Sequence, residues 1–243
     1  MGGVESSGVP ILTGTSGFAY EEWKGSFYPR ELRSSAWLSW YASALDTTEI
    51  NLTFYRMPST RITARWAEEV PPHFRFSIKL NRRITHQKKL EDVDSEMEYF
   101  QQGIAPVRDR LAAVLVQLPP WAGSRLEVLG KFLSEYAGRL PLAFEFRHQG
   151  WDTEETASLI ENHGGAIVLA ETDDHSPVRR SSARFLYLRL RRSTYADEEL
   201  KDWADWLRDA GRPAYVYFKH DTEAPSLALR FRRLLGEAGS GGG

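Results

Sequence analysis

The sequence has no cysteine among its 243 residues. This absence excludes disulfide bonds, thiolate metal sites, iron–sulfur clusters and a cysteine nucleophile. It also fits a cytoplasmic protein, because disulfides do not persist in that reducing compartment. Long apolar runs are missing too, so we expect no segment that crosses a membrane. The first eight residues are neither basic nor apolar, so they do not resemble a signal peptide.

The chain also lacks a strong excess of either charge. Its 31 lysines and arginines nearly balance its 33 aspartates and glutamates, and the net charge is −2. The whole molecule therefore has no signature of polyanion binding, and any binding to nucleic acid would depend on a local basic patch. No low-complexity linker divides the sequence. We expect one domain over residues 9–235, with flexible ends at residues 1–8 and 236–243.

Several motifs that identify enzyme classes are absent. There is no G-x-G-x-x-G, no phosphate-loop motif and no H-E-x-x-H, and Ser16 does not lie in a G-x-S-x-G motif. No predicted strand end combines several histidines with acidic ligands, so we expect no catalytic metal. Four carboxylates nevertheless leave a metal site open as an alternative, namely Glu49, Glu145, Glu171 and Asp173.

Strand-like and helix-like segments alternate along the chain. The strand-like runs are residues 10–14, 47–51, 74–80, 113–118, 142–146, 166–170, 185–190 and 214–218. The helix-like runs are residues 34–45, 58–69, 94–111, 124–136 (with Ser124 as a suitable N-cap), 153–162, 197–210 and 224–235. This alternation predicts an α/β fold, a single TIM-like (β/α)8 barrel that lacks the helix before its seventh strand. The alternative is an open doubly wound sheet, whose nucleotide-binding motifs are missing.

Polar and apolar residues alternate along several predicted strands. In the run 74–80, Phe76 and Ile78 share one face, whereas Ser77 and Lys79 share the other. The apolar face would contact the helices, and the polar face would line the barrel interior. The polar residues expected towards the carboxyl ends of the strands are Glu49, Asn51, Lys79, Gln117, Glu145, Arg147, Arg189 and Tyr217. TIM-barrel enzymes have their active sites at this end.

These charged residues allow two interpretations. They could form an ion-pair network that only fills the barrel. Alternatively, because the cations outnumber the carboxylates, the excess positive charge would bind an anionic ligand. Further basic residues flank two of the strands, although runs of charge are more often solvated surfaces. They are Arg82, Arg83, His86, Lys88 and Lys89 after the third strand, and Arg179, Arg180, Arg184, Arg191 and Arg192 around the seventh.

Aromatic residues and one histidine follow the same strands. The aromatics are Phe18, Tyr20, Trp23, Phe27 and Tyr28 after the first strand, Phe54 and Tyr55 after the second, Trp121 after the fourth and Trp151 after the fifth. They would either stack on sugars or bases or pack loops against the barrel rim. Trp37, Trp40, Trp203 and Trp206 belong to helix-like runs and are expected in the core. His86 would either transfer protons or serve as a hydrogen-bonded loop residue.

Several motifs in this sequence resemble those of the DUF72 (YecE-like) family. They are residues 14–18 with Trp23 and 27–29, residues 49–56, 76–79, 85–86, 115–120, 145–148 with Trp151, and 215–218 with Asp221. The matches follow in order over nearly the whole chain. The resemblance implies a TIM-like barrel, but it implies no activity, because the family is named for lacking an assigned function.

The sequence departs from the family pattern after two strands. Arg191 and Arg192 stand where the family often has His-Gly, and Lys219 and His220 stand where it often has two asparagines. Both changes add positive charge near the expected anion site.

The sequence supports three hypotheses about function. The first is an enzyme, a hydrolase of phosphoester or phosphodiester type, that acts on a small anionic ligand with Glu49, Glu145 and His86 as catalytic residues. Its substrate-binding residues would be Asn51, Tyr55, Arg56, Lys79, Gln117, Arg147, Trp151, Arg189, Tyr217 and Asp221. The second is a non-catalytic module that binds nucleic acid or a nucleotide. The third is a scaffold whose polar interior is only structural. The sequence identifies neither a cofactor nor an oligomeric state.

Overall fold

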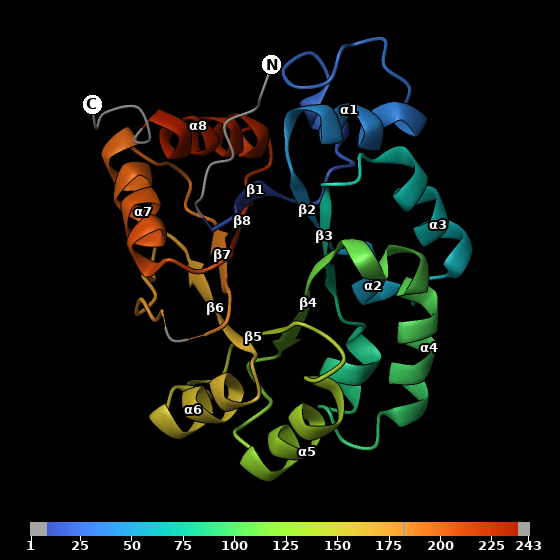
Figure 1. Cartoon of the computed structure of the whole chain (residues 1–243), viewed down its shortest axis with the longest axis vertical. Coiled ribbons are helices and arrows are strands. Elements are labelled where there is room, and N and C mark those ends of the chain that lie inside the picture. The colour runs from blue at the N-terminus through green and yellow to red at the C-terminus, as the bar shows by residue number, and fades with distance from the viewer. Residues whose placement is uncertain (1–8, 182, 238–243) are drawn as a thin grey trace.

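Eight parallel strands close into a barrel in a computed structural model that describes residues 9–181 and 183–237 (Figure 1). Each strand pairs with the next in sequence, and β8 pairs with β1. The strands are β1 Ile11–Ser16, β2 Thr47–Ile50, β3 Arg75–Lys79, β4 Leu111–Leu118, β5 Leu142–Phe146, β6 Ala166–Glu171, β7 Leu186–Leu190 and β8 Ala214–Phe218. This topology confirms the predicted TIM-like barrel.

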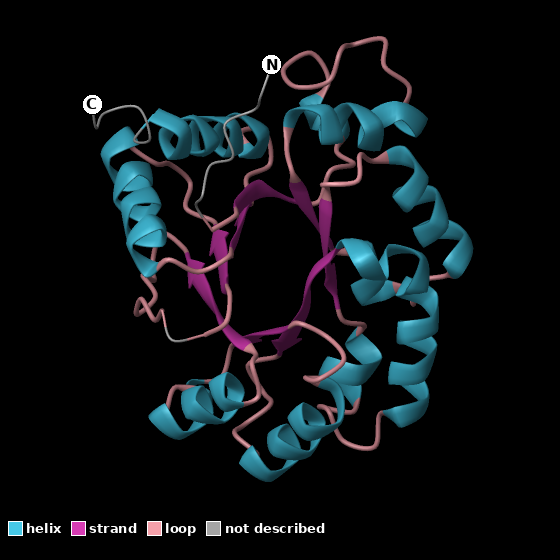
Figure 2. Cartoon of the chain, in the orientation of Figure 1, coloured by secondary structure: helices cyan, strands magenta, loops and turns pink. Residues whose placement is uncertain are grey.

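Helices surround the barrel (Figure 2). They are α1 Trp37–Ala44, α2 Leu52–Tyr55, α3 Thr60–Glu69, α4 Asp94–Ile104, α5 Leu126–Tyr136, α6 Glu154–Asn162, α7 Asp197–Ala210 and α8 Ala224–Glu237. Short 3-10 helices lie at η1 Glu21–Trp23, η2 Ser34–Ala36, η4 Ala105–Arg110 and η5 Gln149–Trp151, and η3 Arg83–Gln87 is a π-helix. Between β6 and β7 there is no helix in residues 172–181 and 183–185, as the sequence predicted.

Some predicted boundaries were wrong. The run predicted as one helix over residues 94–111 is α4 followed by the 3-10 helix η4. Ser124 is not an N-cap, because α5 begins at Leu126 and Arg125 takes the N-cap position without a side-chain hydrogen bond. Helix α8 continues to Glu237, beyond the end at residue 235 predicted for this helix. The predicted flexible residues 1–8 and 238–243 lie outside the described residues.

The two faces of the strands have different side chains, as the alternation predicted. The outward face carries large apolar residues, such as Phe76 and Ile78 on β3, and these pack against the helices. The lower interior is filled by small apolar residues, such as Ala113 and Ala143, together with the rings of Tyr187 and Tyr217. The small residues leave room for these two rings, whose centroids are 5.0 Å apart. This apolar layer supports the polar residues above it.

Close contact between β1 and β2 requires glycine at position 14. A Cβ atom there would lie 1.8 Å from the carbonyl oxygen of Thr47. The hydroxyl of Tyr41, on α1, also accepts a hydrogen bond from the Thr15 amide at 2.8 Å and donates one to Thr47 O at 2.9 Å. Helix α1 therefore fixes these two strands, whose ends carry Ser16 and Glu49 side by side.

The β5–β6 ladder is short. Only Ala143 with Ala166 and Phe144 with Ile167 are in register there, whereas five residue pairs join β4 to β5. Within the part of the chain that the structure describes, no helix is long and apolar enough to cross a bilayer.

Candidate functional site

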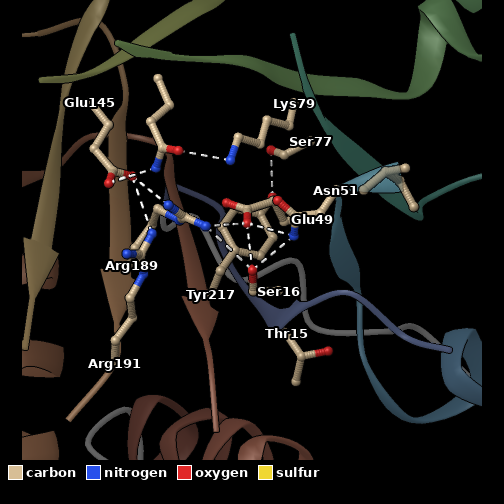
Figure 3. Close-up of polar contacts among 12 residues, drawn as sticks. Thr15, Ser16, Glu49, Asn51, Ser77, Lys79, Glu145, Arg189, Arg191 and Tyr217 are labelled. Carbon is tan, nitrogen blue, oxygen red and sulfur yellow. Dashed lines mark hydrogen bonds and ion pairs between the residues drawn. The ribbon is translucent and has the colours of Figure 1, made fainter. Parts of the chain in front are cut away.

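Arg189 is the centre of a polar cluster inside the carboxyl end of the barrel (Figure 3). It lies on β7, and only 3% of its surface is exposed. Its guanidinium donates to Glu49 on β2, with 2.8 Å between Nη2 and Oε1, and to Glu145 on β5. Burial favours the neutral form of Arg189, but the two carboxylates outweigh burial and raise its pKa. One charged side chain therefore joins three strands.

Glu49 is fully buried, and both of its oxygens accept hydrogen bonds. Oε1 accepts from Ser16 Oγ at 2.5 Å, Asn51 Nδ2 at 3.1 Å and Arg189 Nη2, and Oε2 accepts from Tyr187 at 2.7 Å. Burial acts to raise the pKa of Glu49, but Arg189 and these hydrogen bonds lower it overall. A carboxylate with a lowered pKa and four donors is a weak general base. Glu49 is thus better suited to holding Arg189 in place than to carrying a proton.

Glu145 is also shared among several donors. Its Oε1 accepts from Gln117 Nε2 at 2.8 Å and from Arg147 at 3.1 and 3.2 Å. Its Oε2 accepts from Arg189 and from Arg191 Nη2 at 3.3 Å. One carboxylate therefore contacts three arginines, and its negative charge is more than compensated.

Lys79, at the end of β3, is paired differently from the arginines. Its Nζ donates to the neutral side-chain oxygen of Gln117 at 2.8 Å and lies 4.1 Å from the ring centroid of Phe54. Burial lowers the pKa of Lys79 to about 8, and the positive charge of Arg189 acts in the same direction. The carboxylates of Glu49 and Glu145 oppose this shift without cancelling it.

His86 lies in η3 beside the same phenylalanine. The centroids of the His86 and Phe54 rings are 4.8 Å apart in an edge-to-face arrangement, and Nδ1 lies 2.9 Å from the hydroxyl of Thr85. Burial lowers the pKa of His86, and the charges of Lys79, Arg147 and Arg82 lower it further. The imidazole is therefore neutral at pH 7 and can accept a proton.

Positive charge exceeds negative charge in this group. Four cations (Lys79, Arg147, Arg189 and Arg191) surround two carboxylates, so the formal charge is +2. The Nε atoms of Arg189 and Arg191 are buried and have no acceptor among the described residues. Hydrogen-bond donors therefore outnumber hydrogen-bond acceptors among these side chains. We refer to the following residues as the mouth cluster: Ser16, Glu49, Asn51, Lys79, His86, Gln117, Glu145, Arg147, Arg189 and Arg191.

Five residues predicted to bind substrate lie outside the mouth cluster, and three of them make contacts within the protein. Trp151 is buried, donates to Ala122 O at 2.7 Å and stacks on Phe146, so it packs the rim. Tyr217 is fully buried below the cluster, where its hydroxyl bonds Thr47 and Ser77. The exposed Asp221 uses its carbonyl oxygen to accept from the indole of Trp23. The contacts of all three are structural.

Exposed aromatic residues lie next to Phe54 and His86. Tyr55 is 69% exposed and packs edge-on against Phe54, with 5.0 Å between ring centroids. Trp121 is 64% exposed, and its ring centroid is 5.8 Å from that of His86. Arg56, predicted to bind substrate, is also exposed. Tyr55 and Trp121 therefore offer free ring faces near the mouth cluster.

Five of the ten basic residues predicted in the two runs form ion pairs outside the mouth cluster. Carboxylates from neighbouring helices pair with them, as in Arg83 and Lys88 with Glu96, Arg179 with Asp202, Arg180 with Glu154, and Arg192 with Glu199. Of the basic residues around β7 that depart from the family pattern, Arg191 reaches the mouth cluster but Arg192 does not. For these paired residues, the interpretation of the two basic runs as solvated surface agrees better with the structure than the interpretation as an anion site.

The aromatic residues after β1 pack together. Trp23 and Tyr28 are buried, and Phe27 packs edge-on against both. Trp40 was predicted to lie in the core, but it is 41% exposed and its indole donates to Phe27 O at 3.1 Å.

Sequence reasoning missed part of the site. Ser16 was considered only as a nucleophile, and Tyr187 was not considered as a partner of Glu49. Both could have been found from strand register, because Ser16 pairs with Glu49 across β1 and β2 and Tyr187 alternates with Arg189 on β7.

The four carboxylates considered as metal ligands do not converge. Glu49 and Glu145 are bound to Arg189, Glu171 accepts from the indole of Trp203 at 3.3 Å, and Asp173 accepts from Ser193. Among residues 9–181 and 183–237, no three His, Asp or Glu side chains are grouped so that they could hold a metal ion.

Comparisons with known proteins identify relatives over most of the chain. UPF0759 protein YunF from Bacillus subtilis (strain 168) is 26% identical over 229 residues, covering 76% of this chain and 79% of YunF. The crystal structure of a DUF72 family protein (TM1631) from Thermotoga maritima MSB8 superimposes with a TM-score of 0.79 at 28% identity, covering 93% of this chain and 99% of that one. A DUF72 family protein (EF0366) from Enterococcus faecalis V583 gives a TM-score of 0.74 at 20% identity, covering 94% and 98%.

A family model described as a protein of unknown function, DUF72, matches residues 12–241. That range includes β2 to β8, all of β1 except its first residue, and every residue of the mouth cluster. The chain therefore belongs to the DUF72 family.

Proposed function

We propose that this protein is an enzyme that binds a phosphorylated small molecule at the carboxyl end of the barrel and cleaves its phosphoester by hydrolysis. The observation that carries this proposal is the excess of two positive charges in the mouth cluster, where Glu49 and Glu145 already accept several hydrogen bonds each. A phosphate group would supply both the missing negative charge and the missing acceptors.

Arg147 and Arg191 are the cations best placed to bind the phosphate. Each contacts Glu145, but neither is as enclosed as Arg189, and the side chain of Arg147 is 45% exposed. Arg189 is held by Glu49 and Glu145 and fixes the position of both carboxylates. Positively charged groups held rigidly around a phosphoryl group stabilise the charge of the transition state without needing to reorganise.

His86 is the best candidate for the general base. Its pKa is lowered from the ordinary value of 6.5, which favours the neutral form, and its side chain is only partly buried. It would take a proton from the attacking water, whose oxygen forms a bond to phosphorus as the bond to the leaving oxygen breaks. This assignment replaces Glu49 and Glu145 in that role, because every oxygen of the two carboxylates already accepts hydrogen bonds, from Arg189 and from neighbours such as Tyr187 and Gln117.

Thermal unfolding in the presence of anions tests the binding step. A ligand at about 100 times its dissociation constant adds about 2.7 kcal/mol to stability. We expect phosphate or sugar phosphates to stabilise the protein, and we expect Arg191→Met to remove that effect. Arg192→Met is the matched control, because the adjacent Arg192 pairs with Glu199 on α7. An equal response in both variants, or no response in the wild type, would refute the anion site.

Phosphate release tests the chemical step. A panel of phosphomonoesters and phosphodiesters would be incubated with the wild type, with His86→Ala and with His73→Ala, in which an exposed histidine outside the mouth cluster is removed. We expect His86→Ala to lose turnover at least about 100-fold, while His73→Ala keeps it. Equal rates in the two variants would remove His86 from the mechanism.

A second candidate function is non-catalytic binding of a nucleotide or nucleic acid. It is favoured by the free ring faces of Tyr55 and Trp121, on which bases could stack. Under this proposal, Tyr55→Ala weakens binding of nucleotides but not of inorganic phosphate, and affinity falls steeply with salt. Tyr99→Ala is the control, because Tyr99 is similarly exposed but lies on α4. Turnover of any phosphoester would favour the hydrolase over this non-catalytic binding function.

A further inference from the structure

Lys79 is the cation of the mouth cluster that makes no ion pair with a carboxylate within the described residues. Glu49 and Glu145 are paired with arginines, and Lys79 Nζ instead donates to the neutral amide of Gln117 at 2.8 Å. The Gln117 amide donates in turn to Glu145 at 2.8 Å, which fixes its orientation and keeps its oxygen towards Lys79. The amine is therefore held in a defined place without a counter-charge.

Burial and the positive charge of Arg189 reduce the preference of this amine for its charged form. Its half-buried side chain lies against the face of Phe54, a contact that favours the charged form, and the charged groups that influence it are Arg189, Arg147, Glu49 and Glu145. With its pKa lowered to about 8, about a tenth of the Lys79 amine is neutral at pH 7, against far less than 1% for a lysine with the ordinary pKa of about 10.4. Only the neutral amine has the lone pair that a nucleophile needs.

We propose that Lys79 is a catalytic nucleophile that forms an imine with an aldehyde or ketone group of the substrate. This inference rests on the proposed function, because it identifies the phosphorylated substrate as a carbonyl compound whose phosphate is bound by Arg147 and Arg191. Lys79 contacts Gln117, Gln117 contacts Glu145, and Glu145 contacts both arginines, so the amine and the two guanidinium groups are linked through one hydrogen-bonded pair of side chains.

The atoms of the step balance without a co-reactant. The Nζ lone pair forms a bond to the carbonyl carbon, and the carbonyl π electrons move to oxygen, which takes a proton. The carbinolamine then loses this oxygen as water, leaving a C=N bond that is protonated on nitrogen. The Phe54 ring contacts both Lys79 and His86, so the imidazole lies near the amine. The lowered pKa of His86 favours its neutral form, which can accept and return the protons that these steps move.

Reductive trapping tests the inference. The full-length protein would be incubated at pH 7 with D-glyceraldehyde and sodium cyanoborohydride, which reduces an imine to a stable secondary amine, and labelled lysines would be identified by peptide mass spectrometry. We expect Lys79 to be labelled at least tenfold faster than Lys131, which is 77% exposed on α5 and next to Glu127. Labelling of Lys79 no faster than Lys131 would overturn the proposal.

A second measurement uses the pH profile. The labelling rate of Lys79 should rise with a midpoint near its pKa of about 8. Gln117→Glu places a carboxylate beside the amine, which favours its charged form and should slow labelling at pH 7 by about tenfold per pKa unit. An unchanged profile in this variant would contradict the assignment of Gln117 and Lys79 as a pair.

The two proposals can fail separately. Glyceraldehyde carries no phosphate, so it labels Lys79 even if the anion site does not exist. Two further probes then report on the anion site. Inorganic phosphate should slow the trapping of glyceraldehyde, and glyceraldehyde 3-phosphate should be trapped faster than glyceraldehyde. Stabilisation by phosphate without any trapping at Lys79 would refute the imine and leave the anion site in place.

Discussion

Arg189 on β7 and Glu49 on β2 form an ion pair across the inside of the barrel, with 2.8 Å between Nη2 and Oε1. The side chain of Arg189 is 4% exposed to solvent and that of Glu49 is 0% exposed. Taking two charges out of water is costly, so the pair itself adds little net stability, but removing one member leaves the other charge buried and uncompensated. The consequence can be measured for each residue in turn.

Arg189→Met is expected to destabilise the protein by about 3–5 kcal/mol, because Glu49 and Glu145 would both lose their shared cation. Urea unfolding measures this loss. Arg192→Met is the control, since its surface pair with Glu199 should contribute only about 0–1 kcal/mol. If both variants unfolded at the same urea concentration as the wild type, the buried network would have no role in stability.

Glu49 should make stability depend on pH. Its pKa is lowered in the folded protein, so the unfolded chain binds the proton more readily, and the contribution of Glu49 is complete above the unfolded pKa of about 4.3 and lost as pH falls through the lower folded pKa. The difference in unfolding free energy between wild type and Glu49→Gln should therefore be largest at neutral pH and shrink in acid. Glu127→Gln, at an exposed site on α5, is the control variant measured over the same pH range. A Glu49→Gln difference that stayed constant with pH would show that the carboxylate is not stabilised by folding.

Local patterns were sufficient to predict part of this arrangement. The alternation along β3, β5 and β7 placed Lys79, Glu145 and Arg189 on the interior face, because side-chain direction in a strand depends only on position. The pairing of Arg189 with two carboxylates was not predicted, because it joins residues more than 40 positions apart and depends on barrel closure. Between the two alternatives for Trp151, the local pattern could not decide for a similar reason, since the packing against Phe146 that buries it depends on the folded loop.

His86 should report on the charge of Lys79. Burial and the positive charge of Lys79 are the two largest causes of its lowered pKa, so a proton NMR titration should give a value below the ordinary 6.5. Lys79→Met removes one of these causes and should raise the pKa of His86. Lys131→Met, which removes a remote exposed cation, should leave it unchanged. The same titration midpoint in all three proteins would mean that Lys79 does not influence His86.

Gly14 and Gly130 should respond oppositely to alanine. A methyl group at Gly14 would overlap the Thr47 carbonyl, so β1 and β2 must separate, at a cost of about 3 kcal/mol or more. Gly130 lies inside α5 with no atom within 4 Å of the added carbon, so alanine should stabilise the helix by about 0.5–1 kcal/mol. Thermal unfolding of the two variants checks the prediction. A Gly14→Ala protein as stable as the wild type would show that the strands can move apart freely.

The short ladder between β5 and β6 also determines how the barrel comes apart. A closed ring of strands has no edge, and it gains two edges only when one ladder breaks. The seam between β5 and β6 has the fewest paired residues to separate, and β6 is followed by a segment whose described residues contain no helix. Amide protons of Ala166 and Ile167 should therefore exchange with solvent earlier than those of β4. The ring would open at this seam, which lies between Glu145 on β5 and Arg189 on β7, so the ion pair of these two side chains bridges the shortest ladder and opening of the seam would have to break it.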